Sequence, residues 1–425
     1  MKRLLVLALL VATLPAQGTT DAPRYEVLAE TSCAGTRIRP SMSQRQVESA
    51  LDSGASTATF CFAPGTYRMS LTPKRDQTLI GERGAILKGT RIARGWRRNR
   101  AGIWVLRDAR FNPIVESPPF QGSERACEAR PANCHYADLF KNGVRLRRVL
   151  RDTTPPRGAW HWNYVQNRVY VNTTDPRQAR MELTNRNIGI KSAGSLTVGA
   201  LSVKHYGMYG IYAKAGDVLR NVEFAWNHGL GFKLEGDGAA VIDGHTHHNG
   251  RFGGFCIGSN QRIDGVEFSY NNNLHFANSN GRYWGAGAIK CVETTGLVVR
   301  NVYSHHNFSD GFWTDITNRA VLYENNRMVR NERMGILHEI SCSVVIRGNI
   351  LRDNGDDGLF IHSSVHADVY HNTFGGNRDA AVEIRDNLDR KAACASTAGA
   401  YGNRIYENNL NGDTVDGCVA PRNDC

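Results

Sequence analysis

Apolar and polar residues alternate over short stretches in the second half of the chain, and these stretches repeat. Each copy has a polar turn, alternating apolar positions, an asparagine, a short loop, and then a small residue followed by an apolar one. The copies read NVEFAWNHGLGF, GHTHHNGRFGGF, NVYSHHNFSDGF, NNRMVRNERMGI, GNILRDNGDDGL and HNTFGGNRDAAV. A period of two predicts short strands, and the copies are too short to hold helices as well. Such units must stack to bury their apolar sides, so the pattern predicts a solenoid of β-coils.

Asparagines mark the corners of these coils in two registers. The main register contains Asn227, Asn249, Asn271, Asn307, Asn331, Asn354 and Asn377, separated by 22, 22, 36, 24, 23 and 23 residues. A second register, five or six residues earlier, contains Asn221, Asn301, Asn325, Asn349 and Asn372. Asparagine tolerates left-handed backbone and bonds to nearby backbone groups, so stacked asparagines are expected to satisfy amides between coils.

The asparagine spacing and the following small-apolar step resemble those of the right-handed parallel β-helix, or pectin-lyase-like, proteins. The resemblance covers about residues 183–410 and implies an all-β fold, a right-handed single-stranded parallel β-helix. The stretch ATFCFAPGTYRMSLTPKRDQTLIGERGAILKG (58–89) resembles the first coils of that family. Residues 90–180 interrupt the pattern and predict an inserted small β-rich subdomain in the N-terminal half. The expected divisions are a signal peptide (1–16), N-terminal coils (23–89), the insertion (90–180), and the main β-helix with a disulfide-pinned C-terminal cap (181–425).

Aligning the coils on the small residue separates inward from outward positions, because side chains alternate along a strand. The next position carries an apolar ladder that is expected to fill the core: Ile211, Phe232, Phe255, Ile289, Phe312, Ile336, Leu359 and Val382. Two columns are expected to face solvent. One contains Tyr212, Lys233, Cys256, Lys290, Trp313, Leu337, Phe360 and Glu383, and the other contains Lys214, Glu235, Gly258, Val292, Asp315, Glu339, His362 and Arg385.

Two acids become neighbours in the second column. Adjacent rungs of a parallel sheet are about 4.8 Å apart, so Asp315 and Glu339 are expected side by side, next to Lys290 and Trp313. Their repulsion should raise the pKa of one acid and leave the other ionised, as a glycosidase requires. We therefore predict Asp315, Glu339 and Lys290 as catalytic residues and Trp313 as a platform for a sugar ring. Further substrate-binding candidates from these columns are His362, Arg385, Glu383, Glu235 and Lys233.

A simpler interpretation of the same columns is a surface ladder without function. In that case Lys290, His362 and Arg385 only neutralise the two acids, which contributes little to stability.

One coil is longer than the others. The spacing of 36 residues between Asn271 and Asn307 exceeds the usual 23 by 13, and the extra stretch, NNLHFANSNGRYWGAG, ends shortly before Lys290. Long loops within compact repeats are usually functional or disordered. The side chains of His275, Tyr283 and Trp284 are therefore expected to line one side of a groove and to bind substrate.

The remaining histidines form a separate group on another strand of the coil. His245, His247, His248, His305 and His306 precede the corner asparagines. No carboxylate is expected in their register, so the sequence predicts no metal site and no resident cofactor.

The ends and the charge of the chain bear on its location and partners. The start, MKRLLVLALLVATLPAQGTT, has the cations, apolar run and small-residue exit of a secretory signal peptide, so a secreted or periplasmic protein is expected. No later stretch approaches the roughly 20 apolar residues of a membrane-spanning helix.

Ten cysteines are expected to form disulfides, with Cys127 and Cys134 pinning a loop. The net charge of +12 fits an acidic polysaccharide, and no nucleic-acid-binding motif accompanies the basic residues.

These features predict an exported polysaccharide-degrading enzyme, with a glycoside hydrolase as the leading hypothesis. The alternative is a lyase or C5-epimerase on a uronic polysaccharide, with Lys290 or His362 as base. Arg385, or a Ca²⁺ ion held by Asp315 and Glu339, would then neutralise the substrate carboxylate. The chain lacks the WxDH sequence of pectate lyases, the Asp-Pro-His stretch of alginate epimerases, and the NTD, GHG and RIK elements of polygalacturonases. A second alternative is a noncatalytic glycan-binding protein, which would keep Trp313 without needing both acids.

Overall fold

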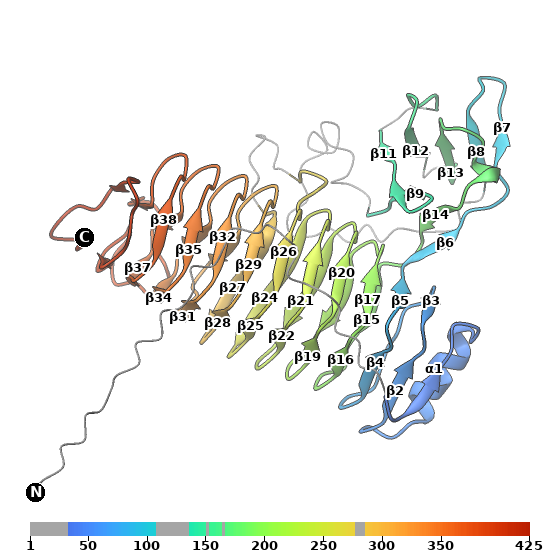
Figure 1. Ribbon diagram of the computed structural model, residues 1–425, viewed down its shortest axis with the longest axis horizontal. Helices are drawn as coiled ribbons and strands as arrows, with labels where there is room; N and C mark the ends of the chain where they lie inside the picture. The colour runs from blue at the N-terminus through green and yellow to red at the C-terminus, as the bar shows by residue number, and fades with distance from the viewer. Residues whose placement is uncertain (1–32, 108–135, 150–152, 164–165, 277–284) are drawn as a thin grey trace, which may run out of the picture.

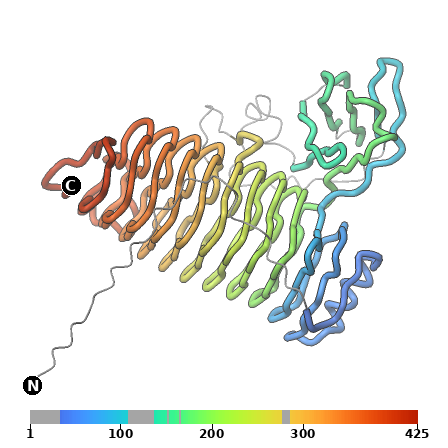
Figure 2. Tube along the Cα trace, in the orientation of Figure 1, coloured from blue at the N-terminus to red at the C-terminus, as the bar shows by residue number. Residues whose placement is uncertain are grey.

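Stacked β-coils form the body of the protein and run along its longest axis (Figure 1). The computed structural model describes residues 33–107, 136–149, 153–163, 166–276 and 285–425. Successive coils lie on one another from the N-terminal to the C-terminal end, as the trace in Figure 2 shows. The predicted fold class, a right-handed parallel β-helix with extra β-rich elements near the N-terminal end, is confirmed.

Three ladders of parallel strands make the walls of the β-helix. The first ladder contains β15 (Ile188–Lys191), β18 (Tyr209–Ala213), β21 (Leu230–Glu235), β24 (Phe252–Ser259), β27 (Gly287–Thr295), β30 (Phe312–Asp315), β33 (Ile336–Glu339), β36 (Leu359–His362), β39 (Val382–Arg385) and β41 (Val415–Asp416). The second contains β1 (Thr36–Ile38), β2 (Thr59–Phe62), β4 (Thr78–Gly81), β16 (Thr197–Gly199), β19 (Val218–Arg220), β22 (Ala240–Ile242), β25 (Arg262–Asp264), β28 (Val298–Arg300), β31 (Arg319–Glu324), β34 (Cys342–Arg347), β37 (Val365–Tyr370) and β40 (Arg404–Tyr406). The third contains β3 (Gly65–Tyr67), β5 (Ala85–Lys88), β17 (Ser202–Lys204), β20 (Glu223–Ala225), β23 (His245–His247), β26 (Glu267–Ser269), β29 (Tyr303–His305), β32 (Arg327–Val329), β35 (Ile350–Arg352) and β38 (Thr373–Gly375).

The main asparagine register forms a continuous buried ladder. From Asn227 to Asn377, each side-chain Nδ2 atom donates a hydrogen bond to the Oδ1 atom of the next asparagine, over distances of 2.9–3.2 Å. The same Oδ1 atoms also accept backbone N–H groups, for example from Asn307 to Asn331. Each buried amide is therefore satisfied by the coil above or below it, which fixes the stacking register.

The second asparagine register is only partly as predicted. The buried ladder runs through Asn326, Asn349, Asn372 and Asn408. The predicted Asn221, Asn301 and Asn325 stand one residue earlier in their coils, at left-handed corners with φ of 54°, 54° and 55°. The neighbouring asparagines Asn325 and Asn326 make the two positions hard to distinguish by spacing alone.

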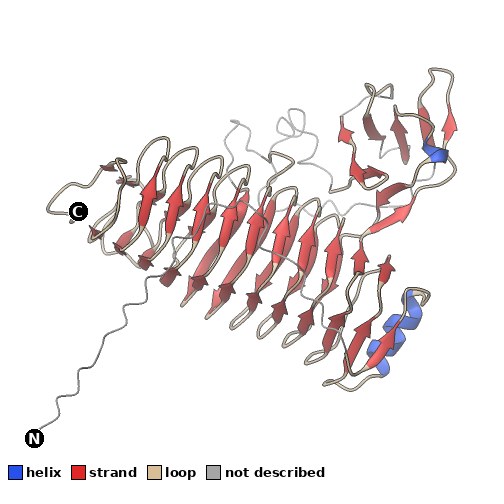
Figure 3. Cartoon of the chain, in the orientation of Figure 1, coloured by secondary structure: helices blue, strands red, loops and turns tan. Residues whose placement is uncertain are grey.

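One α-helix, α1 (Gln44–Ser53), lies beside the first coils, and the strand pattern did not predict it (Figure 3). Ser43 caps its N-terminus in a capping box with Gln46. Val47 and Leu51 are buried and belong to the apolar core of the β-helix. The helix therefore covers apolar surface that the first coil would otherwise expose. The Ser-x-x-Gln step before the apolar pair was the available signal.

The inserted segment contains two small sheets. One holds β6 (Thr90–Ile92), β9 (Leu139–Lys141), β10 (Val144–Arg145) and β14 (Met181–Thr184), and the other holds β7 (Arg97–Arg98), β8 (Trp104–Arg107), β11 (Arg147–Arg148), β12 (Ala159–Asn163) and β13 (Arg168–Val171). A short 3-10 helix spans Pro176–Gln178. Strands β4 and β5 pair directly with β16 and β17, so the chain leaves the β-helix after β5 and returns to the next coil.

Four disulfides lie within the described chain, three of them between residues 28–52 positions apart and one closing a short loop near its end. They link Cys33 to Cys61, Cys256 to Cys291, Cys342 to Cys394, and Cys418 to Cys425. The predicted signal peptide and the predicted loop at Cys127 and Cys134 lie outside the described residues. In the described part of the chain, no helix combines the length and the apolar character needed to cross a bilayer.

Candidate functional site

The two predicted columns lie on the first ladder, on strands β27, β30, β33, β36 and β39. Lys290 pairs in register with Trp313, Trp313 with Leu337, Leu337 with Phe360, and Phe360 with Glu383. In the other column Val292 pairs with Asp315, and Glu339 pairs with His362, which pairs with Arg385. The side chains of Trp313, Leu337 and Phe360 form a small apolar cluster with Met334, separate from the core of the β-helix. This part of both columns therefore lies on the outer side of the wall.

The expectation that these columns face solvent is wrong for their central residues. Lys290 and Trp313 are 2% exposed, Asp315 is 3% exposed and Glu339 is 7% exposed. One reason is that the chain after β39 folds back over the wall, where Arg390 contacts Glu339 and the disulfide Cys342–Cys394 holds the segment. His362 and Glu383 are partly buried and Arg385 is exposed. The acids are thus outside the core but shielded from bulk water.

Asp315 and Lys290 form a buried ion pair. The Nζ atom of Lys290 donates to Oδ2 of Asp315 at 2.7 Å and lies 3.3 Å from the ring centroid of Trp313. Burial lowers the pKa of Lys290, although the charge of Asp315 acts in the opposite direction. Burial and the nearby charge of Glu339 raise the pKa of Asp315 despite the ion pair with Lys290. Asp315 therefore keeps its proton to a higher pH than a solvated aspartate.

Glu339 has the opposite shift. Its Oε1 atom lies 3.1 Å from Nδ1 of His362 and accepts a further hydrogen bond from Arg390. Burial alone would raise the pKa of Glu339, but these hydrogen bonds and the charge of Arg390 outweigh it and lower the pKa. The pKa values of the two neighbouring acids are thus shifted in opposite directions, and Asp315 is the acid that stays protonated to higher pH.

Two buried polar atoms at the site have no hydrogen-bond partner among the described residues. They are Oδ1 of Asp315 and Nε1 of Trp313. Because buried polar atoms are normally paired, such atoms suggest a place where a polar ligand or water would bind. A sugar hydroxyl can both donate to a carboxylate and accept from an indole N–H.

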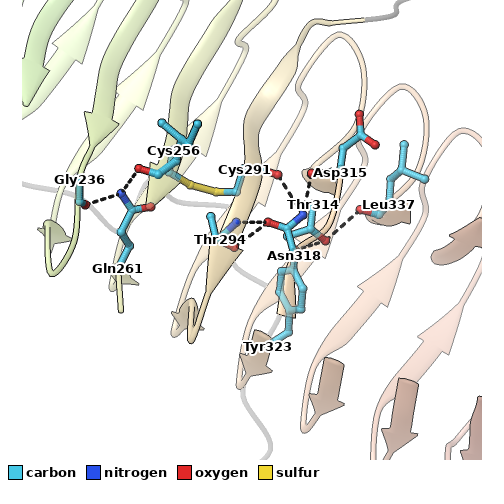
Figure 4. Close-up of a disulfide and its surroundings, with 11 residues drawn as sticks. Gly236, Cys256, Gln261, Cys291, Thr294, Thr314, Asp315, Asn318, Tyr323 and Leu337 are labelled. Atoms are coloured by element: carbon cyan, nitrogen blue, oxygen red, sulfur yellow. Dashed lines mark hydrogen bonds between the residues drawn. A yellow bond between two sulfur atoms is a disulfide. The ribbon is translucent and has the colours of Figure 1, made fainter. Parts of the chain in front are cut away.

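The inner side of the same strands carries a hydrogen-bonded chain that sets the acids in place. Thr314 lies between Trp313 and Asp315 in the sequence and points inward, where its Oγ1 is 2.8 Å from Nδ1 of His338 and 3.2 Å from the hydroxyl of Tyr323. Figure 4 shows Asp315 extending from the opposite side of the strand to Thr314, and Asn318 bonding to the backbone oxygen of Asp315. Burial lowers the pKa of His338 to about 3, so this imidazole is neutral.

The predicted alignment of the β24 coil is wrong by one residue. The predicted outward residue Cys256 is fully buried and forms a disulfide with Cys291 inside the β-helix (Figure 4). Phe255, predicted for the core, pairs with Lys233 and Lys290 instead and so takes the outward column. Gly254 occupies the core position, where an added Cβ would come within 2.2 Å of the ring of Phe232. The glycines at 253 and 254 leave the alignment of this coil ambiguous.

The other predicted substrate-binding residues are less closely grouped. Lys233 and Glu235, on β21, bond to each other at 2.5 Å, three strands away from Asp315 along the ladder. Lys214 and Tyr212 also bond to Glu235, at 2.9 Å and 2.6 Å, so this is a separate surface cluster. His275 packs edge-on against Phe308 at 4.8 Å, in a corner of the next coil. The predicted Tyr283 and Trp284 lie outside the described residues.

Two residues near the site were missed by the sequence reasoning. Arg390 belongs to the non-repeating segment after β39, so no periodic pattern could align it with Glu339. Asp357 stands directly before Gly358, is 2% exposed, and shares a hydrogen bond with Glu383. Burial and the charge of Glu383 raise the pKa of Asp357 to about 7. The repeat indicated this position, because Asp310 occupies the equivalent place directly before Gly311 in an earlier coil.

Comparison with known proteins supports the fold. Residues 209–377 match the family model described as right handed beta helix region. The chain is a right-handed parallel β-helix protein. No curated protein matches it in sequence.

Solved structures with the same fold include carbohydrate-related proteins. A structure titled as the complex of XylC with xylose has a TM-score of 0.56 and 15% identity, covering 88% of this β-helix protein and 75% of that chain. The A-module of the Azotobacter vinelandii mannuronan C-5 epimerase AlgE4 has a TM-score of 0.54 and 12% identity, covering 89% of this chain and 94% of that one. The Dettilon tailspike protein has a TM-score of 0.51 and 11% identity, covering 91% and 70%. At these identities the likeness is one of fold.

Proposed function

We propose that the protein is an exported enzyme that acts on a polysaccharide, and that it is a glycoside hydrolase. The observation that carries the proposal is the pair of neighbouring carboxyls, Asp315 and Glu339, with pKa values shifted in opposite directions. Glycoside hydrolysis needs one carboxylic acid to donate a proton and one carboxylate to attack or to activate water. The titles of proteins with this fold, which name xylose and mannuronan, support a carbohydrate substrate.

In the proposed reaction Asp315 is the acid and Glu339 the nucleophile. Asp315 protonates the glycosidic oxygen as the bond to the anomeric carbon breaks, and the Glu339 carboxylate bonds to that carbon. Water then cleaves the glycosyl ester, and the Asp315 carboxylate takes up its proton. The spacing of about 4.8 Å between adjacent rungs favours this retaining route over an inverting one. Lys290 tunes Asp315, and Trp313 offers its indole N–H to the sugar.

Substrate entry requires the chain over the wall to open, because both acids are almost fully buried. In this conformation Arg390 occupies one oxygen of Glu339. A hydroxyl or water that replaces Arg390 would leave the Glu339 carboxylate available for reaction.

One observation favours a second candidate, a lyase or epimerase on a uronic polysaccharide. Burial lowers the pKa of Lys290, and a neutral lysine could remove the proton at C5 of a uronic acid. Arg390 or the exposed Arg385 would then pair with the substrate carboxylate.

The experiment that separates these functions is incubation with a panel of neutral and uronic polysaccharides. New reducing ends without new ultraviolet absorbance indicate hydrolysis, and an early product with unchanged anomeric configuration by proton NMR supports the Glu339 nucleophile. New absorbance from an unsaturated product indicates elimination. Deuterium uptake from heavy water without chain cleavage indicates epimerisation, and either of these last results contradicts the hydrolase.

A further inference from the structure

Five consecutive coils carry a large side chain at a left-handed corner. The corner lies between the third ladder and the buried asparagine ladder, and its residues are Trp226, His248, Tyr270, His306 and Arg330, with φ of 52–56°. This backbone region suits glycine and asparagine, and aromatic residues rarely adopt it. Another corner of the same coils uses asparagine, as at Asn301 and Asn325. Disfavoured conformations that recur in register point to a role for the side chains.

The aromatic side chains at this corner form a continuous stack along the β-helix. The ring centroids of Trp226 and His248 are 4.4 Å apart, those of His248 and Tyr270 are 5.0 Å apart, and those of Tyr270 and His306 are 5.4 Å apart. The rings are within 15–23° of parallel. Because neighbouring rings cover each other's faces, the stack presents ring edges outward. Tyr270 is 38% exposed.

A network of imidazoles and carboxylates holds two of these rings in place. Nδ1 of His306 lies 2.8 Å from Nδ1 of His305, whose Nε2 lies 3.2 Å from Oε1 of Glu267. His248, His247 and Glu223 repeat this arrangement, at 2.8 Å and 3.0 Å. The expectation that no carboxylate shares the register of these histidines is therefore wrong. Within the described residues, no group of three or more His, Cys, Asp or Glu side chains is arranged to hold a metal ion.

An open cavity of 440 Å³ lies at the Arg330 end of the stack. It is lined by Tyr270, His275, His306, Asn307, Phe308, Arg330 and Glu332. The volume suits a small ligand, and the walls combine aromatic groups with one cation and one anion. The fixed edges of Tyr270 and His306 offer hydroxyl and imidazole groups to such a ligand.

We propose that this cavity binds one uronic acid unit of an acidic polysaccharide, as a site separate from Asp315 and Glu339. The guanidinium of Arg330 pairs with the sugar carboxylate, and Glu332 accepts hydrogen bonds from sugar hydroxyls. Phe308 contacts the apolar face of the ring, and the Tyr270 hydroxyl bonds to a sugar hydroxyl. The net charge of +12 favours an anionic chain over a neutral one. The site serves to hold a glycan and does not depend on the hydrolase proposal.

The test is calorimetric titration of the full protein with trigalacturonate and trimannuronate, and with the neutral trisaccharides of galactose and mannose. Tyr270→Asn and Arg330→Asn remove the ring and the cation but keep a residue that accepts the corner conformation. Asp353→Asn is the matched control, because Asp353 holds the next left-handed corner, with φ of 56°, outside the cavity. Circular dichroism verifies that each variant is folded.

We expect a uronic trisaccharide to bind the wild-type protein at least about tenfold more tightly than its neutral counterpart, the effect of losing one charge-assisted pair. Tyr270→Asn and Arg330→Asn should each weaken uronic binding by about tenfold or more, and Asp353→Asn by less than about twofold. Asp315→Asn should bind as the wild type does, which separates this site from the proposed catalytic one. The proposal is overturned if neither uronic probe binds at millimolar concentration. It is equally overturned if binding survives both corner substitutions or is lost in Asp315→Asn.

Discussion

The Nζ atom of Lys290 lies 2.7 Å from the Oδ2 atom of Asp315 on the outer side of the β-helix wall, yet both side chains are buried. Replacing a buried ion pair with well-packed apolar residues of similar volume is often neutral or stabilising. Stability alone therefore gives no reason to keep Lys290 and Asp315 in these positions. The pair is explained if its charges act on a substrate that enters the site. The opposite pKa shifts of Asp315 and Glu339 then give one acid that donates a proton and one that is ionised.

Removing the lysine should change how activity depends on pH. In Lys290→Met the cation that lowers the pKa of Asp315 is absent, so that pKa rises further. An acid catalyst loses activity as pH rises through its pKa, so the basic limb of the pH–rate profile should move to higher pH. Lys233→Met is the control, because Lys233 stands in the same column but pairs with Glu235. A basic limb that stays in place in Lys290→Met would show that Asp315 is not the proton donor.

Removing Arg390 should shift the acidic limb of the pH–rate profile. Arg390 contributes to the lowered pKa of Glu339, so Arg390→Gln raises that pKa. The ionised form is lost as pH falls through the pKa, and the acidic limb of the profile should therefore move to higher pH. Arg385→Gln serves as the comparison, because Arg385 bonds to Glu383 at 2.5 Å. If both arginine variants keep the wild-type acidic limb, the contact between Arg390 and Glu339 has no part in activity.

Asp357 should make the protein less stable as pH rises. Its pKa is about 7 in the folded protein, against 3.8 for an ordinary solvated aspartate, so the folded state binds more protons than the unfolded state between these values. Stability from this group is complete below about pH 3.8 and is lost as pH rises to about 7, by up to about 1.4 kcal/mol per pH unit. Asp357→Asn should remove that slope and be more stable than wild type at pH 8. Urea unfolding from pH 4 to 8, with Asp353→Asn as control, measures this, and equal slopes would contradict the assignment.

Substitution of any asparagine in the buried ladder should lower the stability of the protein. Asn331→Ala removes the Oδ1 atom that accepts from the backbone N–H and the Nδ2 atom of Asn307, at 3.3 Å and 2.9 Å, and the Nδ2 atom that donates to Oδ1 of Asn354 at 3.2 Å. We expect a loss of about 2–4 kcal/mol in the free energy of unfolding, from the loss of these buried hydrogen bonds. Asn325→Gly, at an exposed left-handed corner with φ of 55°, should change it by less than about 1 kcal/mol. Similar losses in both variants would mean that the ladder does not stabilise the stack.

The repeat made the coils and most of the strand register predictable, because one pattern had to satisfy the same geometry many times. Lys290, Trp313, Asp315 and Glu339 were therefore placed on the correct strands. Where two equivalent residues were adjacent, as at Gly253 and Gly254, spacing could not select between them. The steric conflict with the ring of Phe232, which does select, is a contact between coils.

Burial at the site could not be predicted from the same pattern. Alternation tells which side of a strand a residue faces, but not whether another segment covers that side. Arg390 reaches Glu339 from 51 residues further along the chain, in a segment without the repeat. The oppositely shifted pKa values were expected from the proximity of two acids, whereas the choice of Asp315 as the acid depends on His362 and Arg390 next to Glu339.

The most direct test of the central claim is turnover of a polysaccharide that the wild-type protein cleaves, measured by reducing ends for Asp315→Asn and Glu339→Gln. Both substitutions keep the shape of the side chain and remove its acid chemistry, so each should lower kcat by about 100-fold or more while the protein remains folded. Lys233→Gln, in the separate cluster on β21, should keep wild-type turnover. Full turnover in both acid variants would show that the chemistry takes place elsewhere on the molecule.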